Sequence, residues 1–571
     1  MNLESTRIFS CDSSRSQTVC GRWKQTVETR EMPAPTKLGS VVNCPVCHVS
    51  HLPQQKDVKN GVFAATCQNC GHFFKFKVDS GLATTVTLTV NGQKYTVSTD
   101  QYSPSTSLNK FLRTSGASLG TKVMCREGGC GMCVVEAKLY EPISFVKRPY
   151  SINSCLYPVF LCDGWEITTV EGISHKGDDS VPERLAQYNG SQCGYCSDGQ
   201  VMNMHSLLEY NGGQVTMQQV EDAFDNVICR CTGYRPILDA MKSFAVDSPL
   251  NKKKSSCTVD IEDMGRLGKV CTRTGGPCRG RCSSSDVGEM TRVMLKDSEW
   301  FQPKSVQQVF DAMKQAAGRK TKLVFGNTGY GVFKELGQWM YQVLIDLRGV
   351  QEMYGVDFDA DVVLGANLSL SQLQDIFYRG KSEPNLYYFD QLYERTKNIA
   401  AHSVRNLGCW AGNLMLKHAH PEFPSDVYCM LEAAAAQLDI TDGSQTQVGS
   451  YEISHFLTLD MTGKLIVAMT LPGLDSKDYY IRTYNVSKRT QNAHAYVNAG
   501  IRMRLDSTQN FLVKEKPTLV FGGISATFNH ATQTEAYLVG KQLADPNVFK
   551  EFKLYIFSIS GALQPPQTSD A

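Results

Sequence analysis

The chain has 571 residues, with 58 Lys or Arg against 56 Asp or Glu, which gives a formal net charge of +2. This balance lacks the basic field of a nucleic-acid-binding protein, so we expect no nucleic-acid partner. The length predicts several domains, and no apolar run is long enough to cross a bilayer.

The cysteines are the most informative residues in the composition. The N-terminus lacks the apolar core of a secretory signal, so we expect a cytoplasmic protein whose thiols stay reduced. In that compartment, 21 cysteines predict metal binding rather than disulfides. Twelve of them fall into three groups of four along the sequence.

Residues 1–40 are rich in Ser, Thr and Arg and are predicted to be disordered. Residues 41–80 carry two Cys-x2-Cys knuckles, which predict a zinc-ribbon-like domain with a structural zinc because four thiolates complete a tetrahedron. An apolar strand over 73–76 would pack beneath the metal. Thiols without metal are the alternative, and an adaptor that binds a protein or a nucleic acid stays open. The four predicted zinc ligands are Cys44, Cys47, Cys67 and Cys70.

Residues 82–175 open with a predicted hairpin. Two alternating β-branched runs flank Asn91-Gly92, the strongest short turn signal. A helix capped by a serine is expected over 107–113.

The next loop has the Cys-x4-Cys-x2-Cys spacing of a plant-type [2Fe–2S] site, carried by Cys125, Cys130 and Cys133. Glycines in this loop allow it to wrap a cluster closely and to aim backbone N–H groups at sulfur. The fourth thiolate must come from downstream, and the candidates are Cys155 and Cys162.

Residues 178–248 hold a second group of thiols. A Cys-x2-Cys pair and a Cys-x-Cys pair suit an iron–sulfur cluster, with each pair expected to hold one iron. Zinc is the rival, but Cys-x-Cys is tighter than its usual knuckles. Helical spacing over 201–210 and 217–227 predicts a small bundle with Asp222 and Asp225 on its polar face. The four thiols are those of Cys193, Cys196, Cys229 and Cys231.

Residues 249–298 turn to Lys, Ser, Gly and Arg and are predicted to be a linker. A new fold then begins with a helix over 306–316 and a strand over 322–325. The glycine-rich turn after this strand could bring backbone amides close to a pyrophosphate. Its spacing is not that of a Rossmann fingerprint, and by itself the turn could equally be an ordinary β-turn.

Two motifs carry a resemblance to a known family, namely Gln192-Cys-Gly-Tyr-Cys196 and Cys229-Arg-Cys-Thr-Gly-Tyr-Arg-Pro236. They resemble the second [2Fe–2S] domain of the xanthine dehydrogenase/aldehyde oxidase family of molybdenum hydroxylases, and in detail the insect aldehyde oxidases. The resemblance covers roughly residues 85 to 555. It implies Cys155 as the last ligand of the first cluster and Cys162 as a buried thiol beside it.

The fold class implied by the resemblance is α+β and multidomain. A β-grasp ferredoxin-like domain is expected over 82–175 and a helical [2Fe–2S] domain over 178–248. An α+β FAD-binding domain is expected over 299–476, followed by an incomplete flavoprotein C-terminal subdomain over 477–571.

The resemblance also implies which residues hold the FAD. Glu127 and Gly128 match the loop that approaches the flavin, and Leu465 and Ile466 match the strand that flanks its ring. The pyrophosphate loop is matched by Leu323, Val324, Phe325, Gly326, Asn327, Thr328 and Gly329. The second flavin segment is matched by Arg405, Asn406, Gly412 and Asn413, and a cofactor-holding carboxylate by Asp426.

The family reaction implied is hydroxylation of an aldehyde or an N-heterocycle at molybdenum, with electrons passing through two [2Fe–2S] clusters and FAD to oxygen or NAD. We see no molybdopterin-binding half and expect this chain to be the electron-transfer half of such an oxidoreductase, unable to hydroxylate a substrate alone. The family is usually dimeric, so a homodimer is expected. Two alternatives stay open: a subunit that pairs with a separate molybdenum subunit, and a zinc-ribbon adaptor with relic redox domains.

Overall fold

The protein divides into two units, Met1–Ala83 and Thr84–Ala571. A computed structural model describes strands β1 to β7 of the first unit and most of the second. The described residues of the second unit are 85–141, 146–173, 180–249, 289–295, 298–333, 341–444, 448–475, 477–489, 492–525 and 528–552. Within them, no helix combines the length and the apolar character needed to span a membrane.

In the first unit, a sheet has the strand order β1-β6-β5-β4, and β2 pairs with β3. The strand predicted over 73–76 lies within β6. The four predicted zinc ligands, like residues 1–35, fall outside the described residues, so the zinc site remains a prediction. The strands are β1 (Thr36–Lys37), β2 (Val42–Asn43), β3 (Ser50–His51), β4 (Val58–Lys59), β5 (Val62–Thr66), β6 (Phe73–Asp79) and β7 (Leu82–Ala83).

The second unit begins with a five-stranded sheet of order β11-β10-β12-β8-β9. Its predicted hairpin is present, with Asn91 and Gly92 both at positive φ (50° and 82°), as a tight turn between twisted strands requires. The predicted cap is also present, since the Ser107 side chain accepts from the N–H of Lys110. The elements are β8 (Thr85–Val90), β9 (Gln93–Ser98), α1 (Leu108–Thr114), β10 (Val134–Glu141), β11 (Val146–Asn153), η2 (Val159–Cys162), β12 (Glu166–Thr168) and η3 (Val170–Gly172).

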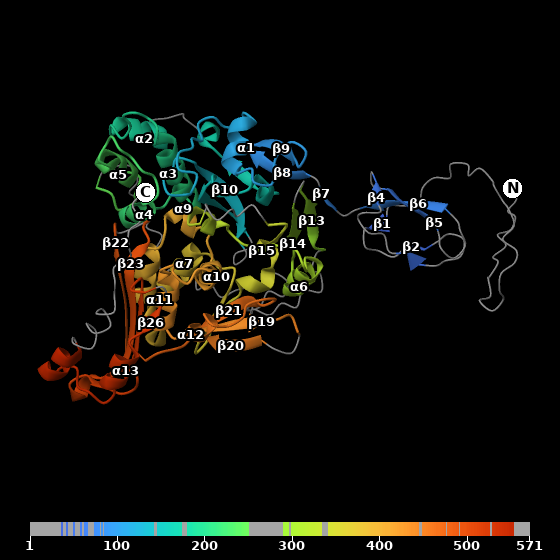
Figure 1. Cartoon of the computed structure of the whole chain (residues 1–571). Coiled ribbons are helices and arrows are strands. Elements are labelled where there is room, and N and C mark those ends of the chain that lie inside the picture. Colours follow the sequence, from blue (N-terminus) through green and yellow to red (C-terminus); the bar gives the residue numbers. More distant parts are fainter. Residues whose placement is uncertain are drawn as a thin grey trace, which may run out of the picture. The chain divides into compact units, whose positions relative to one another are not determined.

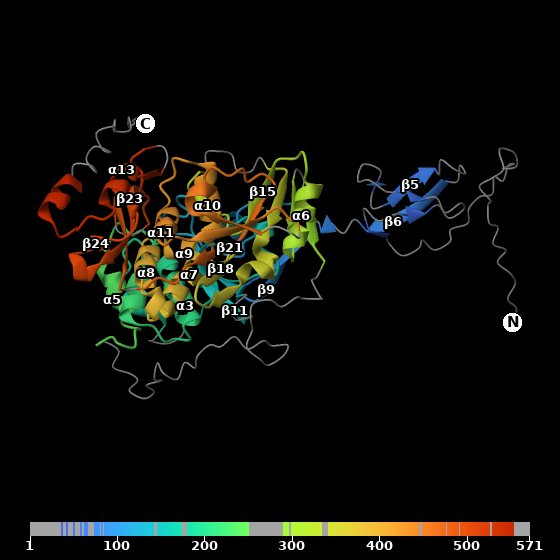
Figure 2. The same cartoon turned by 90° about the horizontal axis from the view of Figure 1, so that it is seen from below.

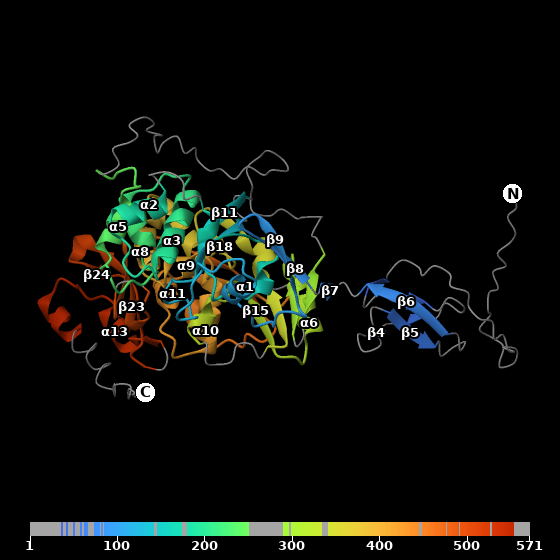
Figure 3. The ribbon, with the colours of Figure 1, turned by 90° about the horizontal axis from the view of Figure 1, so that it is seen from above.

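A helical bundle follows, and α3 packs against β10 and β11 of the preceding sheet (Figures 1 and 3). The helix predicted over 201–210 starts earlier, because it continues directly from the turn at Cys196. The helix predicted over 217–227 ends sooner, at Ala223, where the N–H of the C-cap residue Phe224 donates to the carbonyl of Glu221. The helices are α2 (Val181–Gln187), α3 (Ser197–Tyr210), α4 (Met217–Ala223) and α5 (Arg235–Lys242).

The predicted flavin module contains two sheets around one large core. The first has the order β15-β16-β14-β13, in which β14, β16 and β15 run parallel. The second has the order β17-β18-β21-β19-β20. The strands of the two sheets are β13 (Thr291–Met294), β14 (Glu299–Gln302), β15 (Thr321–Val324), β16 (Val343–Asp346), β17 (Val356–Phe358), β18 (Val362–Gly365), β19 (Gln437–Thr441), β20 (Val448–Glu452) and β21 (Leu465–Leu471).

Helices pack around these sheets and share the core, where Ile345, Leu364, Met430 and Met469 are all buried. The α-helices are α6 (Val306–Gln315), α7 (Leu370–Gly380), α8 (Phe389–Lys397), α9 (His402–Arg405), α10 (Trp410–Ala419), α11 (Asp426–Ala433) and α12 (Ile453–Phe456). The short 3₁₀ helices are η5 (Thr328–Gly331), η8 (Leu347–Gly349), η9 (Gln351–Tyr354) and η10 (Pro384–Leu386).

The last subdomain is built on a sheet of order β22-β23-β25-β26, with β24 paired to β23. Helix α11 of the flavin module packs on this sheet and lies beside β23 (Figure 2). It joins the subdomain to the flavin module. The elements are β22 (Tyr479–Ser487), β23 (Ala495–Asp506), η11 (Ser507–Gln509), β24 (Leu512–Val513), β25 (Thr518–Gly522), β26 (Asn529–His530) and α13 (Thr532–Leu538).

Candidate functional site

The first group of thiols comes together as two pairs. The side chain of Cys125 interacts with that of Cys130, and the side chain of Cys133 with that of Cys155. Three of the four are buried, and Cys125 is half-buried. Cys162 lies apart, because its thiol donates to the carbonyl of Pro158 over 3.6 Å. Of the two downstream candidates, Cys155 is therefore the one that meets the loop.

Backbone groups of the loop favour negative charge on sulfur. The hydrogen bond from Cys130 lowers the pKa of Cys125 to about 5, and the N–H of Glu127, 3.5 Å from the sulfur, acts in the same direction. The loop reaches this shape because Gly128 and Gly131 adopt positive φ values of 79° and 72°. The loop is thus shaped to hold thiolates.

The second group also forms two pairs, but not the pairs expected from sequence. Cys193 interacts with Cys231 and Cys196 interacts with Cys229, so each pair joins one thiol from each motif. Cys196 and Cys229 are buried, while Cys193 and Cys231 are exposed. Which two thiols share an iron stays a prediction. The turn before α3 places its two thiols at different depths.

Both groups supply four free thiols that stand as two pairs. Four thiolates around a single zinc would converge on one point. In a [2Fe–2S] cluster each of two irons takes two thiolates, so the ligands stand as two pairs. The donor set fits the cluster.

The two cysteine loops touch each other. The N–H of Ile228 donates to the carbonyl of Cys130 over 2.9 Å. A Cβ on Gly131 would lie 2.1 Å from the carbonyl oxygen of Asn226, so only glycine allows this approach. Because Ile228 precedes Cys229, a short covalent and hydrogen-bonded path joins a thiol of one group to a thiol of the other.

The predicted pyrophosphate loop leaves the end of β15 and runs against the first cysteine loop. A Cβ on Gly326 would lie 2.0 Å from the carbonyl oxygen of Leu407, and one on Gly331 would lie 2.2 Å from that of Glu127. The side chain of Asn327 donates to the carbonyl of Leu156 over 3.1 Å. The loop is therefore seated between the flavin module and the cysteine loop that carries Glu127 and Gly128.

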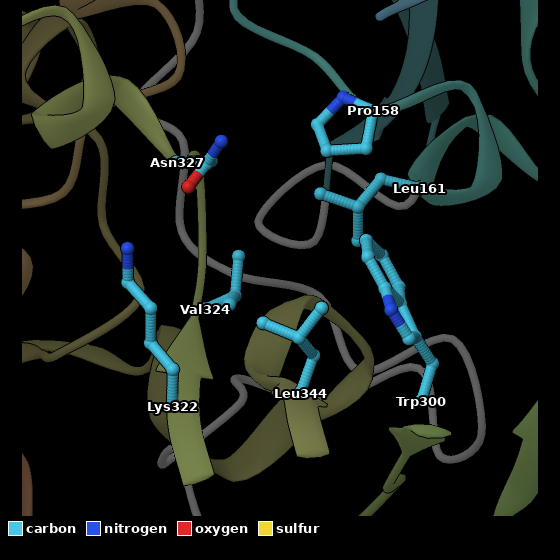
Figure 4. A pocket seen from close by; sticks show the side chains of 7 residues that line it. All are labelled: Pro158, Leu161, Trp300, Lys322, Val324, Asn327 and Leu344. Atoms are coloured by element: carbon cyan, nitrogen blue, oxygen red, sulfur yellow. The ribbon is translucent and has the colours of Figure 1, made fainter. Parts of the chain in front are cut away.

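Residues of β15 and Phe325, which follows it, divide between the two faces of the strand. Leu323 and Phe325 pack on the core of the flavin module. On the other face, Val324 lines a small pocket together with Asn327 and residues of η2, and Figure 4 shows the two sides of this pocket. The pocket is lined by Pro158, Leu161, Trp300, Lys322, Val324, Asn327 and Leu344.

The predicted second flavin segment forms the start of α10. The N–H of Gly412 donates to the sulfur of Cys409, the N-cap residue, over 3.2 Å. Asn413 accepts a hydrogen bond of 2.5 Å from Ser425. Asn498 donates to the carboxylate of Asp426 over 3.0 Å, and burial raises the pKa of this carboxylate despite that hydrogen bond. Thr328 lies against the same segment, since a Cβ on Gly408 would be 3.0 Å from its hydroxyl oxygen.

Two residues matched to the second flavin segment have partners in other domains. The Arg405 guanidinium pairs with Asp225 of the helical bundle, and the Asn406 amide donates to the carbonyl of Ser151. The polar face expected for Asp225 is wrong, since its side chain is fully buried. Both contacts join segments that are far apart in the sequence, so no local pattern signalled them.

Leu465 and Ile466 are each only 3% exposed, and their side chains belong to the core. Trp410 is also part of the core, and its indole N–H donates to the carbonyl of Gly365 over 2.9 Å. His418 and His420 diverge: the first reaches the carbonyl of Leu459, and the second stacks on Phe333.

One residue that sequence reasoning missed is Asn153. Its amide donates to the carbonyl of Gly128 over 3.1 Å and to the hydroxyl of Ser403 over 2.8 Å, so it ties the first cysteine loop to the flavin module. Its side-chain oxygen lies 3.9 Å from the sulfur of Cys133. Its place two residues before Cys155 was the only available signal.

Four protein-family models match successive parts of the chain. The 2Fe-2S iron-sulfur cluster binding domain matches residues 88–159, and the [2Fe-2S] binding domain matches 169–242. The FAD binding domain in molybdopterin dehydrogenase matches 295–474, and the CO dehydrogenase flavoprotein C-terminal domain matches 482–555. The chain therefore contains two 2Fe-2S domains and an FAD-binding domain.

Curated relatives agree with these matches. The chain is 30% identical over 524 residues to an indole-3-acetaldehyde oxidase from Zea mays, a match that covers 86% of this chain and 38% of that protein. It is 29% identical over 496 residues to a xanthine dehydrogenase from Emericella nidulans, covering 81% of this chain and 35% of that protein. The chain thus spans little more than a third of the length of these relatives.

Among solved structures, the chain is similar to a carbon monoxide dehydrogenase from Hydrogenophaga pseudoflava, with 19% identity and a TM-score of 0.40. That match covers 48% of this chain and 90% of the other. The order of the four domain matches and the two curated relatives agree with one another. The chain belongs to the xanthine dehydrogenase/aldehyde oxidase family of molybdenum hydroxylases, within which it corresponds to the iron–sulfur and FAD portion.

Proposed function

We propose that this chain binds two [2Fe–2S] clusters and one FAD and passes electrons between them, as the electron-transfer part of an aldehyde oxidase- or xanthine dehydrogenase-type oxidoreductase. The observation that carries the proposal is the contact between the two cysteine loops, where Ile228 donates to Cys130. When bound, the clusters carry single electrons and the FAD links them to a two-electron acceptor. In this proposal, residues of the two cysteine loops and of the flavin module bind the clusters and the FAD and hold them in position.

For the clusters, the proposed ligands are the two groups of four cysteines. The hydrogen bond from the N–H of Thr232 to the sulfur of Cys229, 3.5 Å long, stabilises a thiolate in the second group as that of Glu127 does in the first. Burial of Cys130, Cys133 and Cys155 excludes water from the first group. We therefore expect the first cluster to be shielded and the second to have one exposed edge, at Cys193 and Cys231.

For the FAD, the proposed cradle is formed by the loop after β15 and the start of α10. Backbone N–H groups of the two segments are the proposed partners of a pyrophosphate, and Asn327 and Thr328 supply polar groups. Asp426, held by Asn498, is the proposed acceptor for a hydroxyl or N–H of the cofactor. Contact of Gly331 with the carbonyl of Glu127 brings this cradle next to the first cysteine loop.

We further propose that hydroxylation of an aldehyde or an N-heterocycle takes place on a molybdopterin-binding portion, either in the same polypeptide or in a separate subunit, with oxygen or NAD as the final acceptor. The length of the curated relatives supports this division. A homodimer and a cytoplasmic location are also proposals from the family resemblance.

The experiment is cofactor analysis of the purified full chain, followed by anaerobic reduction. We expect roughly four irons, four sulfides and one FAD per chain, with absorbance changes of both cofactor types on addition of dithionite. Reoxidation by oxygen or by NAD then identifies the acceptor. A correctly folded chain that lacks iron and flavin after reconstitution would contradict the proposal and favour the adaptor alternative.

A further inference from the structure

A buried ion pair joins the helical bundle to the flavin module. The guanidinium of Arg405, the last residue of α9, contacts the carboxylate of Asp225 at 2.9 Å. The side chains are 1% and 0% exposed. Such a pair is costly to bury, and removal of one partner leaves an uncompensated buried charge.

Asp225 and Arg405 each form further hydrogen bonds. The second carboxylate oxygen of Asp225 accepts from the N–H of His402 over 2.8 Å, so Asp225 caps α9 where Ala401, at the N-cap, has no side-chain acceptor. Arg405 also donates to the carbonyls of Ile399 and Ala400, each at 3.0 Å, and to that of Asp222 at 3.3 Å. The pair therefore fixes the position of Asp225 relative to the flavin module.

Asp225 begins the segment that carries a proposed ligand of the second cluster. Four residues later comes Cys229, and between them Ile228 donates to the carbonyl of Cys130. Val227 accepts from the side chain of Gln200 over 3.1 Å. The segment 225–229 is thus held at one end by the flavin module and at the other by the first cysteine loop.

The same helix, α9, also touches the first cysteine loop, because Ser403 accepts from Asn153. One four-residue helix of the flavin module therefore contacts both proposed cluster domains through buried groups. Electron transfer between centres depends on their separation, so a helix that fixes both loops fixes the relative positions of all three cofactors.

We propose that Asp225 and Arg405 are positioning residues for electron transfer: their ion pair holds Cys229, and with it the second cluster, at a fixed distance from the first cluster and the flavin. This inference rests on the proposed function, because it requires that both clusters are bound.

The test uses the full chain, reduced anaerobically with dithionite, and measures the magnetic interaction between the two reduced clusters by low-temperature EPR. This interaction depends steeply on the distance between the clusters, and a residue that only added stability would not change it in folded, loaded protein. The variants are Asp225→Asn, which keeps an acceptor for His402, and Arg405→Met. Arg405→Lys is the conservative replacement, which keeps the charge and should restore part of the interaction.

The matched control is Lys397→Met. Lys397 forms an ion pair with Asp222 across the same two domains at 3.2 Å, but that pair is partly exposed and does not belong to the segment that carries Cys229. The magnetic interaction appears as a splitting of the EPR signals. We expect this splitting to be lost or reduced in Asp225→Asn and Arg405→Met at full iron and flavin content, and unchanged in Lys397→Met. Loss of the second cluster alone, with the first cluster and FAD retained, would also support the proposal.

Parental splitting in both variants at full cofactor content would overturn it, and so would a uniform loss of every cofactor, which would assign the pair a general folding role. The unsubstituted chain separates these failures from failure of the proposed function: if it binds no clusters, the proposed function itself is wrong.

Discussion

The backbone N–H of Ile228 donates to the carbonyl of Cys130 over 2.9 Å, across a separation of nearly one hundred residues. This hydrogen bond makes two cysteine loops from different domains into one structure. Its neighbours explain how the loops come so close: Gly131 and Gly199 lack a Cβ where the backbones cross, since a Cβ on Gly199 would lie 2.6 Å from the carbonyl oxygen of Gly131.

Substitution of Gly131 by Ala should separate the loops. A left-handed conformation costs a non-glycine residue about 1–2 kcal/mol, and here the added Cβ would also overlap the carbonyl oxygen of Asn226. Gly213→Ala is the control, because Gly213 has a φ of +80° but open space around its Cβ position. We expect chemical denaturation to show a larger decrease in the free energy of unfolding for Gly131→Ala than for Gly213→Ala. Equal losses would mean that the close approach is unimportant.

Cys155 and Cys162 should differ sharply when each is replaced by Ser. Cys155 meets Cys133, whereas Cys162 donates to Pro158 away from the quartet. We expect Cys155→Ser to lose the first cluster, and so about half of the iron, while Cys162→Ser keeps a full complement. Iron and sulfide analysis with visible circular dichroism measures both. Retention of two clusters in Cys155→Ser would remove this residue from the ligand set.

Asp426→Asn should weaken FAD binding while the fold is retained. The substitution keeps the shape of the side chain but removes its negative charge. That charge accepts a hydrogen bond from Asn498 and is the proposed acceptor for the cofactor. A hydrogen bond to a charged group is worth about 1.5–3 kcal/mol, which corresponds to an increase in Kd of about tenfold to a hundredfold. Flavin titration of the apoprotein measures it. Asp439→Asn, on β19, is the control and should bind FAD normally.

The C-terminal subdomain should lose stability in alkaline solution. Hydrogen bonds to Glu432 and Glu535 raise the pKa of His530 from 6.5 to about 9. Because the folded state holds this proton more tightly, the stabilisation is complete below pH 6.5 and disappears as the pH rises through about 9. Since the ring is partly exposed, we expect a contribution on the order of 1–2 kcal/mol.

His530→Gln should abolish that part of the pH dependence, measured by chemical denaturation at several pH values between 6 and 10. His455→Gln is the matched control, since the His455 ring packs on Tyr451. An unchanged pH profile in His530→Gln would show that the ion-paired histidine does not control the stability of the subdomain.

Local sequence determined the parts of this protein that depend on neighbouring residues. The Asn91-Gly92 turn, the Ser107 cap and the spacing of the cysteines each act over a few residues, and the structure contains the turn and the cap as expected. The family matches agree with the order of the domains, because each cysteine motif is itself a local pattern. These features could be predicted because the responsible contacts lie within one turn or one loop.

Only the tertiary structure decided which thiols pair and which polar residues join the domains. Cys193 meets Cys231 rather than Cys196, and Asp225 meets Arg405 across 180 residues. Periodicity placed Asp225 on a polar face, because a sequence shows which side of a helix is polar but not what will cover it. Burying two opposite charges together is favourable only when a distant segment supplies the partner, and that condition is set by the packing of whole domains.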